Sequence, residues 1–167
     1  YRFFDQSLNV SDVEEFHLEQ AFVEALKNRE FVLHYQPQVC LEAMEIIGYE
    51  ALVRWQHPGF GLLYPDRFIP VAEKTGFVVS LGMEVVRLAC AQISDWQQKH
   101  GISKPVAVNV SPIQLAQPGF CKDVLATLAD YGLTTDLLEL EITETAMLEG
   151  RAVESLHCLK AAGIRLS

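Results

Sequence analysis

Four segments of the chain alternate between apolar and polar residues, and this alternation limits the possible folds more than any other feature. Residues two apart share a face of a β-strand, so each segment predicts a strand with one apolar face and one face of small, amide or acidic side chains. Strands buried on both faces of a parallel sheet are instead continuously apolar. The pattern therefore favours a barrel with a polar site inside its mouth, and an open sheet wetted on one face is the alternative. The four segments are 31–39, 46–55, 105–110 and 137–143.

A polar turn at residues 42–45 leads from the first strand into the second, and helical segments separate the later strands. Apolar residues recur at helical spacing in segments 11–26, 81–96 and 120–131. Two further helices are predicted at 66–75, between a capping Asp66 and Gly76, and at 151–162, ended by Gly163. A capping box formed by Ser11 and Glu14 predicts the start of the first helix, which makes residues 1–10 a linker. Alternating strands and helices predict an α/β fold with a parallel sheet. A complete (β/α)8 TIM-type barrel needs roughly 250 residues, so residues 11–167 are expected to form only its first four to five strand–helix units.

Composition excludes several classes of protein. Half of the 167 residues are apolar, which excludes a disordered chain. The net charge of −9 has the wrong sign for a protein that binds a nucleic-acid polymer by phosphate attraction.

The sequence contains neither a membrane span nor a signal peptide, so we expect a cytoplasmic segment without membrane contact. The cysteines lack metal-binding spacing and are expected to be reduced core thiols; they are Cys40, Cys90, Cys121 and Cys158.

The polar faces carry a set of hard oxygen ligands. Glu50, Asn109 and Glu141 each lie on the polar side of a predicted strand. Two carboxylates and an amide suit Mg²⁺ or Mn²⁺ rather than Zn²⁺. Arg54 lies two residues beyond Glu50 on the same face, where it can bind a phosphate through two parallel hydrogen bonds. Together these residues predict hydrolysis of a phosphate ester by a metal-activated water.

The residues around Glu50 resemble the name-giving motif of the EAL-domain cyclic di-GMP phosphodiesterases. The motif is carried by Glu50-Ala51-Leu52-Val53-Arg54-Trp55. Further motifs stand in the order and spacing of that family, and they are Tyr35-Gln36-Pro37-Gln38, His57-Pro58, Phe68-Ile69-Pro70-Val71-Ala72-Glu73, Gly76, Asn109-Val110-Ser111 and Glu139-Leu140-Glu141-Ile142-Thr143-Glu144-Thr145. The resemblance covers residues 16–167, nearly the whole chain.

The resemblance implies a catalytic role for four acidic or amide residues. Glu50, Asn109 and Glu141 are similar to ligands of a catalytic divalent metal. Glu144 is similar to a glutamate that steadies the active-site loop after the fifth strand of the barrel. The metal of the family is Mg²⁺ or Mn²⁺, and Ca²⁺ is expected to inhibit.

The resemblance also implies a substrate. The family hydrolyses one phosphodiester of the bacterial second messenger cyclic di-GMP and yields linear pGpG. Gln36, Leu52 and Arg54 resemble its substrate contacts, with Arg54 on a phosphate. A degenerate domain that binds cyclic di-GMP or a protein partner without hydrolysis is the alternative function.

The family pattern includes residues that this sequence does not contain. The resemblance implies an aspartate pair, a lysine, a glutamate and a glutamine beyond Ser167. We therefore expect the 167 residues alone to be inactive, and to self-associate through the open edge of the incomplete barrel. The N-terminal Tyr1-Arg2-Phe3-Phe4-Asp5 resembles the junction that follows a diguanylate-cyclase domain. We therefore also expect a GGDEF-type domain before this one, in a parent protein with its own membrane anchor.

Overall fold

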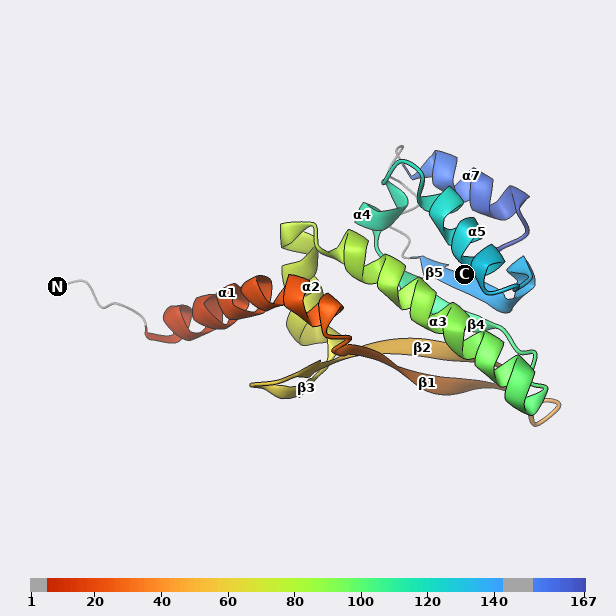
Figure 1. Cartoon of the computed structure of the whole chain (residues 1–167), viewed down its shortest axis with the longest axis horizontal. Helices are drawn as coiled ribbons and strands as arrows, with labels where there is room; N and C mark the ends of the chain where they lie inside the picture. The colour runs from red at the N-terminus through yellow and green to blue at the C-terminus, as the bar shows by residue number, and fades with distance from the viewer. Residues whose placement is uncertain (1–5, 143–151) are drawn as a thin grey trace.

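Strands and helices alternate over most of the chain (Figure 1). The structure is a computed structural model and describes residues 6–142 and 152–167. In chain order the elements are α1 (Gln6–Lys27), β1 (Phe31–Cys40), β2 (Glu45–His57), β3 (Gly61–Leu63), α2 (Pro65–Thr75), α3 (Val78–His100), β4 (Val106–Val110), α4 (Pro112–Leu115), α5 (Phe120–Asp130), the 3-10 helix η1 (Thr135–Leu137), β5 (Leu138–Ile142), α7 (Val153–Ala161) and β6 (Arg165–Leu166). The predicted α/β architecture is confirmed.

The strands of the described residues form one mixed sheet. Its order is β1-β2-β4-β5-β6, and β3 pairs with β2 outside this path. The pairs β2–β4, β4–β5 and β5–β6 are parallel, as predicted. β1 is antiparallel to β2, so the prediction of a wholly parallel sheet is wrong at this edge. The cause is the short connection, because residues 41–44 form a turn whereas a parallel pair needs a crossover of a dozen or more residues.

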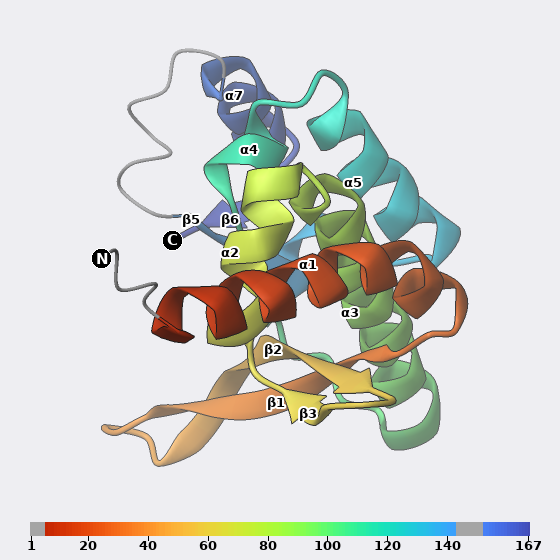
Figure 2. The same ribbon diagram turned by 90° about the vertical axis from the view of Figure 1, so that its left-hand side faces the viewer.

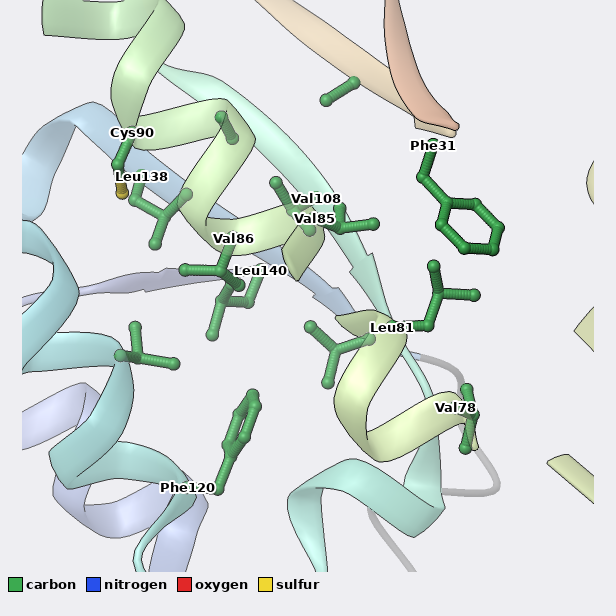
Figure 3. Close-up of a cluster of buried hydrophobic side chains, with 14 of the residues drawn as sticks. Phe31, Val78, Leu81, Val85, Val86, Cys90, Val108, Phe120, Leu138 and Leu140 are labelled. Carbon is green, nitrogen blue, oxygen red and sulfur yellow. The ribbon is translucent and has the colours of Figure 1, made fainter. Parts of the chain in front are cut away.

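Helices cover the apolar side of the sheet. Figure 2 shows α1 and α2 on the same side of the β1–β2 hairpin. Figure 3 shows the buried residues of α3, such as Leu81 and Val86, beside Val108 of β4 and Leu140 of β5. Val108 and Leu140 are almost completely buried. The apolar faces predicted from the alternation therefore form the core, and the polar faces point to the opposite side.

An aromatic cluster ties β2 to the helices. Trp55 is fully buried, and its ring centroid lies 5.2 Å from that of Phe22 on α1 and 5.1 Å from that of Phe31 on β1. The indole Nε1 of Trp55 donates a hydrogen bond to Oε2 of Glu30 at 2.9 Å, so the polar edge of the ring is also satisfied. This cluster fixes the strand that carries Glu50 and Arg54.

Four local elements differ from the sequence predictions. α1 begins at Gln6, upstream of the capping box that predicted its start, because no glycine or proline between residues 6 and 10 interrupts a helix. Three short elements, β3, α4 and η1, were not predicted, since three or four residues are too few to show a hydrophobic period. Among the described helices, including the long α1 and α3, none is apolar enough over a sufficient length to cross a membrane.

Two of the cysteines are joined. Cys121 of α5 and Cys158 of α7 form a disulfide, with their Cα atoms 6.1 Å apart. The prediction of four reduced thiols is therefore wrong for this pair. The 37 residues between them hide the contact in the sequence, and only the packing of α7 beside α5 brings the two sulfur atoms together. Cys90 is buried and free and Cys40 is half-buried and free, as predicted.

Candidate functional site

Glu50, Asn109 and Glu141 converge on one face of the sheet. They lie on the adjacent strands β2, β4 and β5. The Nδ2 of Asn109 donates a hydrogen bond to Oε1 of Glu50 at 3.0 Å. Asn109 and Glu141 are direct partners in the parallel register of β4 and β5. The structure thus brings the three predicted ligands together.

The two-residue period of the strands explains this convergence. Glu50 pairs with Ala107, which lies two residues before Asn109 and therefore on the same face. The adjacent pair, Ala51 and Val108, points to the other face and is buried under the helices. A slip of one residue in this register would expose those apolar side chains. Core packing on one face therefore sets the positions of the polar residues on the other.

The site is strongly acidic. Burial raises the pKa of the Glu141 carboxyl above its ordinary value, and the neighbouring carboxylates of Glu50 and Glu139 raise that pKa further. Glu139 has a basic neighbour, because its Oε2 lies 3.9 Å from Nε of Arg165. The repulsion between Glu50 and Glu141 would be removed by a cation bound between them.

The donor set fits Mg²⁺ or Mn²⁺. Two carboxylates and a carboxamide supply the hard oxygen ligands that these ions prefer. The amide N–H of Asn109 is directed to Glu50, which leaves its Oδ1 to act as a ligand. Within residues 6–142 and 152–167, no three His, Cys, Asp or Glu side chains cluster as a metal site, and the set found here has only two carboxylates. Mg²⁺ commonly keeps several water ligands, so three protein ligands are compatible with it.

Arg54 is oriented by its own neighbours. Its Nη1 donates a hydrogen bond to the carbonyl oxygen of Val53 at 2.8 Å, and its Cζ lies 4.7 Å from the ring centroid of Tyr64, a cation–π distance. The Nε of Arg54 is buried and has no hydrogen-bond partner in the described part of the chain. Tyr64 was not among the predicted site residues, because β3, which returns the chain beside β2 just before this residue, was not predicted.

Gln36 and Leu52 lie on the same face as Glu50. Gln36 is the direct partner of Glu50 in the β1–β2 ladder, and Leu52 follows Glu50 by two residues. Gln36 is exposed and Leu52 is half-buried, so both are accessible from this face. The predicted substrate contacts thus lie beside the predicted metal ligands. Glu144, the predicted loop residue, lies outside the described residues.

A cavity of about 820 Å³ opens beside the acidic cluster. Asn109 and Glu141 line it, together with Ser111 and Gln114 and with apolar side chains from α2 and α3. Its volume is in the range of small-molecule sites. Gln114 was not among the predicted site residues, although a serine at 111 followed three residues later by a glutamine matches the capping-box pattern.

The fold and the site together define a class of protein. The chain is an α/β domain of the barrel type, and its acidic and amide side chains gather toward the carboxyl ends of β4 and β5. Active sites of (β/α)8 enzymes lie at this end of the strands. The family model described as the EAL domain matches residues 19–167. The chain belongs to the EAL domain family.

Relatives and solved structures agree with this assignment. The chain is 40% identical, over its whole length, to MucR of Pseudomonas aeruginosa, named a bifunctional diguanylate cyclase/cyclic di-GMP phosphodiesterase. It is 36% identical, over 99% of its length, to the cyclic di-GMP phosphodiesterase NbdA of the same organism. The chain spans only 25% of MucR and 22% of NbdA. A solved structure of the PaMucR phosphodiesterase in complex with c-di-GMP aligns with a TM-score of 0.82 and 38% identity, covering 90% of this chain and 62% of that one. The predicted family and barrel fold are confirmed.

Proposed function

We propose that the parent domain hydrolyses one phosphodiester bond of cyclic di-GMP to linear pGpG with the help of Mg²⁺ or Mn²⁺. The observation that carries this proposal is the cluster of Glu50, Asn109 and Glu141, which is linked by a 3.0 Å hydrogen bond and by a register pair. The names of MucR and NbdA support the choice of substrate.

In this proposal the three clustered residues hold the cation. Glu50 and Glu141 supply carboxylate oxygens, and Asn109 supplies its amide oxygen while its N–H keeps Glu50 oriented. A cation bound there would lower the pKa of a water molecule and neutralise charge on the phosphate. Glu144, by the family resemblance, steadies the loop that follows β5.

The remaining residues bind the substrate. Arg54 binds a phosphate of the dinucleotide, and its contacts with Val53 and Tyr64 hold the guanidinium on the site face before the substrate arrives. Gln36 and Leu52 contact the substrate from the same face. Since the chain has a net charge of −9, binding of an anionic dinucleotide depends on the local positive charge of Arg54 and the cation.

The 167 residues by themselves are proposed to be inactive. The solved PaMucR chain is longer, since this chain covers 62% of it, and the family resemblance assigns further metal ligands to the remaining part. β1 and β6 lie at the two ends of the described sheet, and such edges favour pairing with a second copy of the chain. Sizing of the purified chain should show a species larger than the monomer, with no turnover of cyclic di-GMP; an active monomer would contradict both expectations.

The surroundings of the domain complete the proposal. MucR is named as a diguanylate cyclase as well as a phosphodiesterase, which supports a GGDEF-type domain ahead of this one in the parent protein. We place the reaction in the cytoplasm. A parent lacking a GGDEF-type domain would contradict the first of these points.

Titration of the full chain with Mn²⁺ tests the metal site. Glu141→Gln should abolish measurable binding, because it removes one of the two anionic ligands. Glu139→Gln is a matched control, because it makes the same change on the same strand and face but at a residue with a basic neighbour, Arg165. It should change the Mn²⁺ affinity far less than Glu141→Gln does. Equal weakening by both changes would mean that Mn²⁺ responds only to the general negative charge, and the proposed site would be wrong.

Binding of cyclic di-GMP without hydrolysis is the alternative function. It would apply if the full-length parent protein bound cyclic di-GMP but released no pGpG in the presence of either Mg²⁺ or Mn²⁺. Release of pGpG by the parent protein would exclude it.

A further inference from the structure

The buried side chain of Gln114 connects the end of β4 to helix α4. Gln114 is only 3% exposed. Its Oε1 accepts a hydrogen bond from the N–H of Ser111 at 3.1 Å, and its own backbone N–H donates to Oγ of Ser111 at 3.4 Å. The two bonds form a reciprocal capping box at the start of α4.

Gly82 of α3 leaves the space that this side chain occupies. A Cβ atom on Gly82 would lie 1.6 Å from Nε2 and 2.3 Å from Cδ of Gln114. The amide of Gln114 therefore packs directly on the backbone of α3. Glycine weakens the interior of a helix, and its presence within α3 fits a requirement for this close approach. Gln114 thus joins α4 to both β4 and α3.

The Nε2 atom of Gln114 is buried and has no hydrogen-bond partner within the described residues. A buried donor without a partner is unfavourable, and a methionine of similar size would avoid that cost. Packing alone therefore does not account for a glutamine at this position. The Oε1 atom of Gln114, in contrast, accepts the hydrogen bond that holds the backbone N–H of Ser111.

This cap acts close to Asn109. β4 ends at Val110, so a single residue separates Asn109 from the capped Ser111. α4 has only four residues and cannot be stable by itself, so its position depends on the cap and on the contact with Gly82. The direction in which the chain leaves β4 is therefore set by Gln114.

We propose that Gln114 is a positioning residue for the metal site, an inference that rests on the proposed role of Asn109 as a ligand. By fixing Ser111 against α3, it holds the end of β4 so that the Asn109 side chain keeps its hydrogen bond to Glu50. Gln114 itself does not touch the cation.

Variants of the full chain separate this role from simple packing. Gln114→Met removes the Oε1 acceptor at similar volume, and Gly82→Ala displaces the amide without changing any residue of the cap. The double variant Gly82→Ala/Gln114→Ala relieves the steric overlap but does not restore the cap. Gln117→Met is the matched control, because Gln117 bonds the carbonyl oxygen of Ile113 and takes no part in the cap. Gln114→Leu, which also removes the Oε1 acceptor, replaces Gln114→Met if that variant does not fold.

Two readouts are followed, the affinity for Mn²⁺ and the side-chain amide resonance of Asn109 in the metal-free chain. Gln114→Met and Gly82→Ala should weaken Mn²⁺ binding about 10- to 100-fold, as loss of a residue that orients a ligand typically does, and should shift the Asn109 resonance. The double variant should regain the thermal stability that Gly82→Ala loses, while its Mn²⁺ affinity stays low. Gln117→Met should match the wild type in both readouts.

Three results would overturn the inference. The first is a folded Gln114→Met chain with wild-type Mn²⁺ affinity and an unmoved Asn109 resonance. The second is recovery of Mn²⁺ affinity in the double variant, which would mean that only packing matters. The third is an equal loss of affinity in Gln117→Met. If the wild-type chain bound no Mn²⁺, the proposed metal site would fail, and the Asn109 resonance would still test the positioning role independently.

Discussion

The disulfide between Cys121 and Cys158 should supply a large part of the stability of the chain. It closes a loop with a sequence separation of 37 residues. The chain-entropy relation for a loop of that length gives about 4 kcal/mol at 25 °C. Typical domains have a total free energy of unfolding of about 5–15 kcal/mol, so the loss is severe. For a chain of this size, about 4 kcal/mol corresponds to a decrease in Tm of roughly 11 °C.

Thermal and urea unfolding of the oxidised and reduced chain measure this contribution. The wild type should lose about 4 kcal/mol when a thiol reductant is added. Cys158→Ser should show that lower stability from the start and should not respond to the reductant. Cys40→Ser is the control, because Cys40 is a free thiol on β1, and this variant should keep the full response. Alkylation of the unfolded chain, counted by mass spectrometry, should label two cysteines without reductant and four with it.

Two observations would refute this reasoning. One is wild-type stability that does not change on reduction, although alkylation shows that the disulfide has opened. The other is labelling of all four cysteines without a reductant, which would mean that the bond is absent.

Three further predictions concern the core, the buried thiol and the phosphate contact. Leu140→Ala removes a fully buried side chain of β5 and should lower the free energy of unfolding by about 2–5 kcal/mol in urea denaturation; a loss below about 1 kcal/mol would contradict the packing of α3 on β5. Burial raises the pKa of the Cys90 thiol to about 12. At pH 8 iodoacetamide should therefore modify Cys90 in the native chain far more slowly than Cys40. Equal rates of modification, followed by mass spectrometry, would contradict this prediction. Arg54→Lys in the parent protein should weaken cyclic di-GMP binding about 10-fold, since one charge-assisted hydrogen bond contributes about 1.5 kcal/mol. The affinity for Mn²⁺ should stay unchanged. Loss of Mn²⁺ binding would contradict the proposed role of Arg54 as a phosphate contact.

The core of the site could be predicted from the sequence because it follows from a local rule. Glu50, Asn109 and Glu141 each alternate with buried residues on their strands, and the period of a strand is fixed at two residues. Once the strands are adjacent and parallel, these side chains must share a face. The family resemblance added the proposed substrate, which alternation cannot provide.

The features that were missed depend on how two segments of the chain pair or pack with each other. β1 is antiparallel because of a four-residue turn, and the hydrophobic pattern of a strand does not encode its direction. The contact of Tyr64 with Arg54 requires β3, which has three residues. The disulfide requires α5 and α7 to pack side by side. None of these is contained in a periodicity of the sequence.

Production of pGpG by the full-length parent protein is the most direct test of the proposed function. Chromatography would follow cyclic di-GMP and pGpG with Mn²⁺ and after its removal by a chelator, for the wild type and for Glu50→Ala. We expect the wild type to release pGpG only with the metal, and we expect Glu50→Ala to release none, because the variant loses one of the two carboxylates beside Asn109. Release of pGpG at the wild-type rate by Glu50→Ala, or by the wild type after removal of the metal, would contradict the account.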